Sequence, residues 1–321
     1  MSTKQPTKEA TRDRYGRALV DLGHRDHRVV VLDADLSKST KTALFADAYP
    51  ERFFNLGIAE ANMIGVAAGL ACTGKIVFAS TFAIFATQRA LNQIFQSVAY
   101  TGLNVKICAT HAGITVGEDG ATHQALDDIA LMRAMPGMKV VVPADAEEAY
   151  QATLAVARYD GPVYLRLGRL ATSVITSDEE PFTIGRAKIM RPGRDITLAA
   201  CGFMVEQSLR AAEKLAEEGI DAEVINVSTI KPLDTETLVQ SAARTGVVVT
   251  VEEHSVIGGL GGAVAEALAS HHPVPVHRVG VPDLFGQSGD AAALLTHYGL
   301  TPENICDTVR QILTNGKERT K

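Results

Sequence analysis

The stretch Phe53-Phe-Asn-Leu-Gly-Ile-Ala-Glu60-Ala-Asn-Met-Ile-Gly-Val-Ala-Ala-Gly-Leu-Ala71 holds a single ionisable side chain in an otherwise largely apolar run. Residues 53–56 predict a short buried strand, and Gly57 ends it. Residues 58–71 predict a helix that is apolar on almost every side, which is typical of a buried helix. A buried strand followed at once by a buried helix favours an α/β fold.

Glu60 falls in the first turn of this predicted helix, where the helix dipole tolerates a carboxylate. A buried carboxylate is costly unless it has a donor partner or a raised pKa. Enzymes hold acid–base carboxylates in this way. The alternative is an ordinary glutamate at a helix N-terminus that faces water, and the helix alone does not decide between the two.

The composition narrows the class of protein. A chain of 321 residues with 46% hydrophobic and 21% charged residues is long enough for about two globular domains. The net charge of −6 argues against binding to nucleic acid. No apolar run reaches the length of a membrane span, and residues 1–14 do not form a signal peptide. The four isolated cysteines suit a reducing compartment, so we expect a cytoplasmic protein: they are Cys72, Cys108, Cys201 and Cys306.

Strand and helix patterns alternate along the whole chain. In the first part, strands are predicted at residues 28–32, 53–56, 75–79, 104–109, 139–142 and 161–169, and helices at 11–22, 58–71, from 81 onwards, 125–135 and 146–158. In the second part, strands are predicted at 196–201, 222–226, 247–251 and 276–279, and helices at 204–217 and 263–270. The pattern predicts two doubly wound, mostly parallel sheets. Residues 179–194 are polar and punctuated by Pro and Gly, so we expect a linker there between domains 1–178 and 195–321.

Polar residues follow two of the predicted strands. Residues 33–40 follow the strand at 28–32, and the glycine-rich loop 110–124 follows the strand at 104–109. Such segments mark the ligand-binding edge of an open α/β sheet. For residues 33–40 taken alone, turn and capping chemistry is the more common explanation. The loop carries His111 and His123, which are too far apart, with intervening acids in no ligand pattern, to predict a metal site.

Three other patterns each allow two interpretations. Phe82 and Phe85 share one helix face and are either core or a stacking platform for a flat heterocycle. Arg166 and Arg169 leave a strand end, where arginine can hold a phosphate. The glycine run 258–262 lacks the G-x-G-x-x-G spacing and favours tight helix packing or a subunit contact over a phosphate site.

Several motifs, each weak alone, occur in an order that resembles the second half of transketolase. They are Ala10-Thr-Arg12, Ala34-Asp35-Leu36 with Ser39, Gly57-Ile-Ala-Glu60, Ser80-Thr-Phe82 with Phe85, Thr110-His111, Gly117-Glu-Asp119-Gly with Thr122-His123-Gln124, and Leu167-Gly-Arg169. The resemblance runs from about residue 10 to about residue 312. The second part, with Val251-Glu-Glu-His254 and Gly258-Gly-Leu-Gly261, is similar to the C-terminal domain of that family.

The resemblance implies a thiamine-diphosphate-dependent enzyme made of a pyrimidine-binding domain and a C-terminal domain. The sequence has no Gly-Asp-Gly followed by Asn at metal-binding distance. The diphosphate-binding domain, which holds Mg²⁺ or Ca²⁺ in this family, is therefore expected on a partner subunit that corresponds to the N-terminal half of transketolase. An α2β2 heterotetramer that acts on sugar phosphates is the assembly we expect.

The resemblance also assigns roles to individual residues. Glu60 corresponds to the glutamate that hydrogen-bonds the aminopyrimidine N1′ of the cofactor. The other residues expected in the cofactor pocket are Phe85, Phe82, Asp35 and Gln88, although Gln88 stands where many family members have an aromatic residue or Arg. The residues expected to bind the sugar phosphate are Arg12, Ser39, His111 and Arg169, with Arg166 as an alternative to Arg169. Asp119 and His123 correspond to residues at the donor hydroxyl and the reacting carbons, and the expected catalytic set is Glu60, His111 and His123.

The sequence leaves two other functions open. One is a beta-type subunit of a 2-oxo-acid dehydrogenase, or part of a 1-deoxyxylulose-5-phosphate synthase, since both share the architecture and a glutamate at the place of Glu60. The other is a non-catalytic regulatory or assembly subunit. The expected phosphate-binding residues and the His123-Gln124 motif favour transfer of a two-carbon ketol unit, which requires charge-assisted donors for a dianion.

Overall fold

The computed structural model describes residues 8–179 and 181–319, with side chains described up to residue 315. Residues 1–7 of the expected first domain and Glu180 of the expected linker lie outside the described residues. Among the residues that are described, no helix is long and apolar enough to cross a bilayer.

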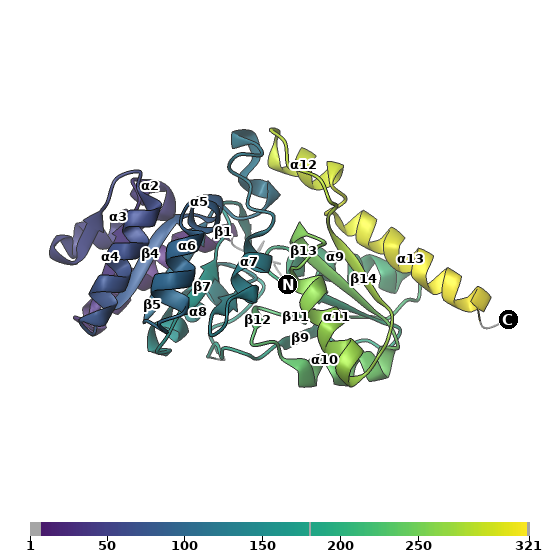
Figure 1. The fold of residues 1–321 in the computed structure, drawn as a ribbon. Helices are drawn as coiled ribbons and strands as arrows, with labels where there is room; N and C mark the ends of the chain where they lie inside the picture. The colour runs from purple at the N-terminus through teal and green to yellow at the C-terminus, as the bar shows by residue number, and fades with distance from the viewer. Residues whose placement is uncertain (1–7, 180, 320–321) are drawn as a thin grey trace.

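Within the described residues, a seven-stranded sheet forms the first half of the molecule (Figure 1). Its strands, in spatial order, are β12 (Thr229–Lys231), β6 (Lys139–Val141), β7 (Val163–Arg166), β5 (Val105–Thr110), β4 (Ile76–Phe82), β2 (Val29–Asp33) and β3 (Phe53–Asn55). All neighbours are parallel except β12, which pairs antiparallel with β6. The central strands β2, β4 and β5 are buried along their whole length and largely apolar, because both faces of the sheet are covered there.

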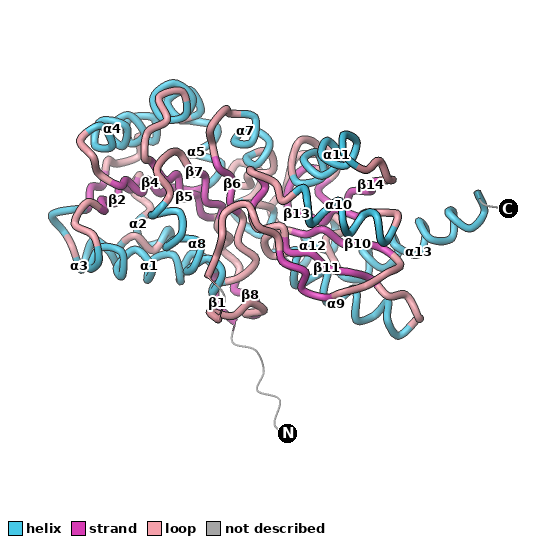
Figure 2. The backbone as a smooth tube through the Cα atoms, turned by 90° about the horizontal axis from the view of Figure 1, so that it is seen from below, coloured by secondary structure: helices cyan, strands magenta, loops and turns pink. Residues whose placement is uncertain are grey.

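Helices cover both faces of this sheet, as Figure 2 shows. One face is covered by α1 (Thr11–Arg25), α3 (Ala43–Ala48) and α8 (Ala146–Arg158), whose apolar side chains share one core cluster with the strands. The opposite face is covered by α4 (Glu60–Cys72), α5 (Ala83–Arg89), α6 (Leu91–Gln93), η2 (Ile94–Ala99) and α7 (Asp128–Ala134). The short segments α2 (Ser37–Thr40), η1 (Pro50–Arg52) and η3 (Ile114–Asp119) lie in the connections.

A five-stranded sheet forms the second half, again counted among the described residues. Its order is β14 (Val276–Val281), β13 (Val248–Ser255), β10 (Ile196–Ala200), β11 (Ala222–Asn226) and β9 (Lys188–Arg191), and β9 alone of these is antiparallel. Its helices are α9 (Met204–Glu217), α10 (Thr235–Thr245), α11 (Leu260–His271), α12 (Ala291–His297) and α13 (Pro302–Arg319). The predicted class, α/β with two mostly parallel sheets, is confirmed.

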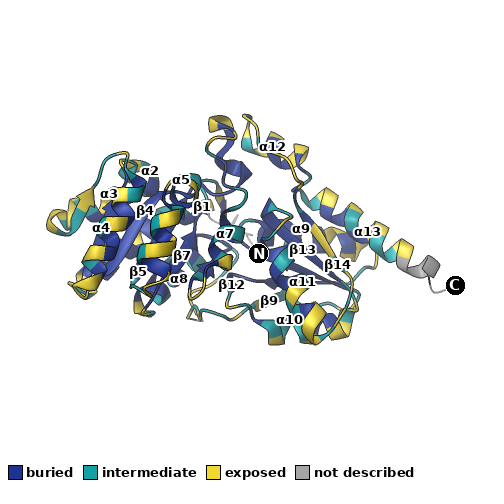
Figure 3. Ribbon diagram, viewed as in Figure 1, coloured by how far each residue is buried: buried dark blue, intermediate teal, exposed yellow. Residues whose placement is uncertain are grey.

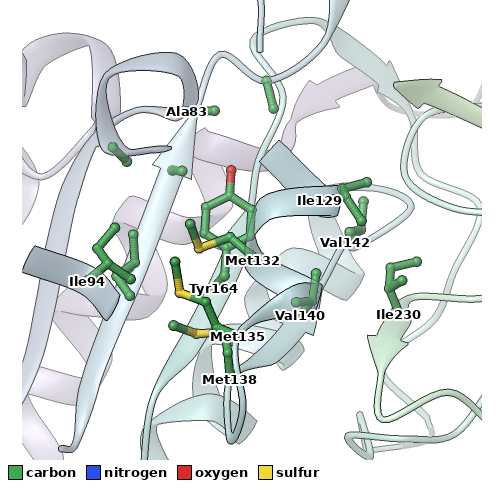
Figure 4. Close-up of a cluster of buried hydrophobic side chains, with 14 of the residues drawn as sticks. Ala83, Ile94, Ile129, Met132, Met135, Met138, Val140, Val142, Tyr164 and Ile230 are labelled. Atoms are coloured by element: carbon green, nitrogen blue, oxygen red, sulfur yellow. The ribbon is translucent and has the colours of Figure 1, made fainter. Parts of the chain in front are cut away.

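One strand of the second half joins the first sheet, and the two halves share a core. Strand β12 lies at the edge of the first sheet although residues on either side of it belong to the second half, and β9 lies within the stretch 179–194 that we expected to be a linker. Strands β1 (Lys8–Ala10) and β8 (Ala171–Ser173) pair antiparallel in a separate two-stranded sheet. One core cluster unites Ile129 and Met132 of α7 with Ile230 of β12, as Figure 4 shows. The halves are therefore packed together through a continuous apolar interface.

Three local predictions for residues 53–82 are wrong. Strand β3 is the outermost strand of its sheet and not buried, since Phe54 is 43% exposed. Helix α4 begins at Glu60 and is buried on one face only, while Gly65 and Gly69 face open space. Strand β4 runs on to Phe82, so the helix that we expected from residue 81 begins at Ala83. Figure 3 shows the buried strands between helices with exposed outer faces.

Candidate active site

The carboxyl ends of β2, β4 and β5 meet at one edge of the first sheet because the three strands are parallel neighbours. Phe82 at the end of β4 is the register partner of Thr110 at the end of β5. This register brings Phe82 beside His111, the first residue after β5. The sheet edge thus joins two segments that the sequence analysis singled out separately, as expected for the ligand edge of such a sheet.

Glu60 is buried, with 4% of its surface exposed. Its Oε1 accepts a hydrogen bond from Arg89 Nη1 at 2.9 Å. The interpretation of Glu60 as a glutamate that faces water is therefore wrong, and the required donor partner is Arg89 of α5. The Arg89 guanidinium also lies over the ring of Phe85, 4.0 Å from its centroid. The carboxylate, the guanidinium and the phenyl ring form one connected group.

The rings of Phe82 and Phe85 stack, with centroids 5.7 Å apart and planes 16° apart. Phe82 stacks in turn on the His111 ring at 3.8 Å, and His123 lies edge-on to Phe85 at 5.2 Å. Phe82 is buried whereas Phe85 is half-buried. The structure therefore brings the two rings expected at the cofactor into contact with the two histidines expected at the substrate.

His111 is held by two polar neighbours in a left-handed backbone conformation with φ of +56°. Arg12 Nη1 lies 3.1 Å from its Nε2, and Thr110 Oγ1 lies 2.9 Å from its Nδ1. Because a guanidinium can only donate, Nε2 must accept and Nδ1 must carry the proton. Burial, and then the positive charges of Arg12 and Arg169, lower the pKa of His111 from 6.5 to about 3. His111 is therefore a neutral imidazole at physiological pH.

Arg12 links α1 to the loop after β2. Its Nη1 donates to the backbone oxygen of Ser39 at 3.0 Å, while its Nε is buried and has no hydrogen-bond partner among the described residues. Burial lowers the pKa of Arg12, and nearby Arg169 acts in the same direction. A buried donor without an acceptor, in a region where positive charges repel one another, is the arrangement that an oxyanion stabilises.

Asp33, which the sequence analysis did not single out, fixes the loop that carries Ser39. Its carboxylate accepts hydrogen bonds from the amide of Leu36 at 2.6 Å and from the hydroxyls of Thr40 and Thr42 at 2.7 and 2.9 Å. Burial raises the pKa of Asp33. An aspartate at a strand end followed by two threonines is the local signal that points to such a turn.

Arg169 and Asp119 lie at the rim of the site. Arg169 Nη1 donates to the backbone oxygen of Val116 at 2.7 Å and lies 3.4 Å from Asp119 Oδ2. Both side chains are about two-fifths exposed.

Arg166, the alternative to Arg169, is instead buried and makes a two-point ion pair with Asp128 at 2.7 and 3.1 Å. Burial raises the pKa of Asp128, but the Arg166 charge outweighs it and the net shift is downward. Arg166 is thus a structural arginine in this chain.

Gln88 and Asp35 lie at the margins of this group. Gln88 is exposed and donates to Asp127 Oδ2 at 2.6 Å, so Arg89, and not Gln88, is the α5 side chain in contact with Glu60. Asp35 is exposed, and its Oδ1 accepts from Asn55 Nδ2 at 3.1 Å. Both remain predictions as cofactor-binding residues.

The glycine run near residue 260 serves helix packing, as predicted. The Glu252 carboxylate accepts from the backbone amides of Leu260 and Gly261 at 2.7 and 2.8 Å and so occupies the N-terminus of α11. A Cβ on Gly259 would lie 2.0 Å from Glu252 Oε2, and one on Gly261 would lie 2.8 Å from Arg278. The described residues contain no group of three or more His, Cys, Asp or Glu side chains placed to hold a metal.

The fold is that of a known class. Residues 7–173 match the family model of the transketolase pyrimidine-binding domain, and residues 185–305 match that of the transketolase C-terminal domain. The chain belongs to the transketolase family.

Individual relatives cover nearly the whole chain. A protein of Methanocaldococcus jannaschii described as a transketolase C-terminal section is 53% identical over 92% of this chain and 94% of its own length. A 6-deoxy-6-sulfo-D-fructose transketolase subunit of a Clostridium species is 46% identical, with 94% of both chains covered. A solved structure of a split gene transketolase, described as an inactive β4 tetramer, has a TM-score of 0.89 at 53% identity and covers 95% of this chain and 98% of that one.

Proposed function

We propose that this chain is one subunit of a thiamine-diphosphate-dependent transketolase that transfers a two-carbon ketol unit between sugar phosphates. The observation that carries the proposal is the contact between two groups. Buried Glu60 pairs with Arg89, whose guanidinium lies over the Phe85 ring of the Phe82–Phe85 stack. That stack touches His111, which lies with Arg12 and Arg169 in one cluster. A site for a flat heterocycle is thus joined to a site for an anion.

The residues present fit the pyrimidine end of the cofactor. A flat heterocycle with a ring nitrogen needs an apolar surface on one side and a carboxyl group at the nitrogen, and the phenyl pair and Glu60 supply both. Thiamine diphosphate, when bound, supplies the electron sink for cleavage of a carbon–carbon bond next to a carbonyl. Glu60 would hold the proton that it shares with N1′ of the pyrimidine. In this proposal Asp35 and Gln88 complete the margin of the pocket.

The second group fits a sugar phosphate. Arg12 offers a buried donor that lacks an acceptor, and Arg169 adds a second guanidinium near it. Neutral His111 adds no charge of its own to this cluster and accepts from Arg12. We assign the phosphate to Arg12, Ser39, His111 and Arg169, the donor hydroxyl to Asp119, and the reacting carbons to His123, which lies against the Phe85 ring.

We further propose that a separate polypeptide supplies the diphosphate-binding domain and the Mg²⁺ or Ca²⁺ ion, and that two copies of each chain form an α2β2 heterotetramer in the cytoplasm. The matched domains are the pyrimidine-binding and C-terminal domains alone. The descriptions of relatives as a C-terminal section and as a subunit support a divided enzyme. The four cysteines, all unpaired, suit a reducing compartment. The division into domains 1–178 and 195–321 is part of this proposal.

The test is to co-express the chain with the protein encoded by the adjacent open reading frame and to purify the complex. The complex should bind thiamine diphosphate with Mg²⁺ and cleave a ketose phosphate such as xylulose 5-phosphate, whereas the chain alone should do neither. Cleavage of a 2-oxo acid in place of a ketose phosphate would instead favour a dehydrogenase beta subunit. Full cofactor affinity of the chain alone would contradict the divided site.

A further inference from the structure

The loop that carries His111, Asp119 and His123 is held by residues of the second half of the chain. Glu253, near the end of β13, extends its carboxylate to this loop, where Oε1 accepts from the backbone amide of Thr115 at 2.7 Å. Both residues are buried. A hydrogen bond between groups 138 residues apart therefore fixes the first turn of η3 from outside its own domain.

The loop backbone is shaped around this carboxylate. Gly113 has φ of +83°, a conformation in which side chains other than glycine are strained. A Cβ on Gly113 would lie 2.3 Å from Glu253 Oε1, so only glycine leaves room for the carboxylate. The loop thus accommodates the Glu253 carboxylate at two points. The Thr115 amide donates to it, and Gly113 has no side chain that would collide with it.

The buried Arg166 holds the main chain of Glu253 from the other side. Arg166 Nη2 donates to the Glu253 backbone oxygen at 3.0 Å and to the backbone oxygen of Ala125 at 3.3 Å, while Asp128 fixes its guanidinium. Ala125 is the residue at which the loop returns to the core. One guanidinium therefore connects the far end of the loop to the strand that carries Glu253.

A second contact holds the loop near His123. Gln124 Nε2 donates to the backbone oxygen of Gln287 at 3.0 Å. A Cβ on Gly120 would lie 2.4 Å from Ser288 Oγ, and one on Gly286 would lie 1.8 Å from Gln124 Oε1. Helix α12 packs on η3 here, and Figure 1 shows it beside this turn at the top of the molecule. Both ends of the loop are thus hydrogen-bonded to the C-terminal half, through Thr115 to Glu253 and through Gln124 to Gln287.

We propose that Glu253 is a positioning residue for substrate binding, and that the C-terminal domain, through Glu253 and residues 286–289, sets the geometry of the loop that carries His111, Asp119 and His123. The inference deepens the proposed function and rests on it. Glu253 acts through the Thr115 amide and does not itself contact the anion-binding cluster in the described contacts.

The test compares three variants of the complex with its unmodified form. Glu253→Ala removes the acceptor of the Thr115 amide, whereas Glu253→Gln keeps an oxygen in its place. Glu223→Ala is the matched control, because Glu223 is a buried carboxylate of the same domain that contacts Thr197 and Arg244 and does not touch the loop. With Glu253→Ala we expect the KM for the ketose phosphate to rise about tenfold, the scale of an unmade buried hydrogen bond. Glu253→Gln and Glu223→Ala should leave the KM within about twofold.

A second readout does not depend on activity. Hydrogen exchange of the amides of residues 113–119 should be faster in Glu253→Ala than in either Glu223→Ala or the unmodified complex. Unchanged exchange would overturn the proposal even if the complex lacked transketolase activity, which would separately overturn the proposed function. An unchanged KM in an active Glu253→Ala complex would also overturn it. If Glu253→Ala does not fold, Gly286→Ala, whose Cβ would displace Gln124, takes its place under the same criteria.

Discussion

Arg89 Nη1 donates a hydrogen bond to Glu60 Oε1 at 2.9 Å, and about half of the Arg89 side chain remains exposed while Glu60 is buried. The buried carboxylate thus depends on a partner that lies at the surface. Removing one partner of such a pair costs more than the pair contributes, because it leaves a buried charge without compensation.

We therefore expect Arg89→Leu to destabilise the chain by about 1–3 kcal/mol, whereas the same substitution in a Glu60→Gln background should cost much less. Chemical denaturation of the four members of this double-mutant cycle measures the difference. Equal costs in both backgrounds would mean that the ion pair does not stabilise Glu60.

Glu60→Gln in the complex should lower ketose phosphate turnover by roughly 100-fold or more, because removal of a positioned acid–base group has that effect. Size-exclusion chromatography should show intact assembly. Glu51→Gln is the matched control, since Glu51 is an exposed glutamate nearby in the sequence that contacts only Arg52 in the described contacts. Turnover of Glu60→Gln within about tenfold of the unmodified complex would exclude an acid–base role.

Arg169→Ala should raise the KM for a phosphorylated donor by about tenfold or more, because a hydrogen bond to a charged group contributes roughly 1.5–3 kcal/mol. The KM for an unphosphorylated ketose should change little. Steady-state kinetics with both donors checks this difference. An equal effect on both would place Arg169 outside the phosphate site.

His111 should make the folded chain sensitive to acid. Its pKa is about 3 in the folded chain and 6.5 in model peptides, so between these values the unfolded chain binds a proton that the folded chain does not. The contribution of His111 to the free energy of unfolding is therefore fully present at a pH above 6.5. It is lost progressively as the pH falls from 6.5 towards 3. Acidification from pH 7 to pH 5 should lower the free energy of unfolding by about 2 kcal/mol through this group. His111→Asn should not show this decrease.

Urea denaturation at the two pH values, in buffers without phosphate, measures the effect. His27→Asn, at an exposed position, is the control and should keep the full acid sensitivity. If His111→Asn loses as much stability on acidification as the unmodified chain, the buried neutral imidazole is not the cause.

Arg166→Met should destabilise the chain by about 3–5 kcal/mol, because it leaves Asp128 buried without its guanidinium partner. Among the described residues the Tyr164 hydroxyl at 2.6 Å and His254 Nε2 at 4.0 Å remain near the carboxylate. The double variant Arg166→Met/Asp128→Leu should recover a large part of that loss. Arg310→Ala removes exposed ion pairs with Glu218 and Asp307 and should barely shift the unfolding midpoint. Denaturation midpoints of the three variants decide whether the buried pair is structural.

The local pattern of residues determined the elements of the fold. The predicted helices at 146–158 and 204–217 and the strand at 222–226 coincide with α8, α9 and β11, because continuous apolar runs and 3.6-residue periodicity are local signals. The ordered motifs likewise indicated Glu60, Phe82, Phe85 and His111, which the parallel strands bring together at one sheet edge.

Only the tertiary structure decided which partners these residues meet. The exposure of Phe54 follows from the position of β3 at the sheet edge, which its apolar composition does not reveal. Arg166 and Arg169 are three residues apart, and the sequence gives both the same possible role at a phosphate. Arg166 is buried against Asp128, whereas Arg169 lies at the rim of the site. The bond between Glu253 and Thr115 joins residues 138 positions apart, and no periodic pattern in a single sequence records a contact at that separation.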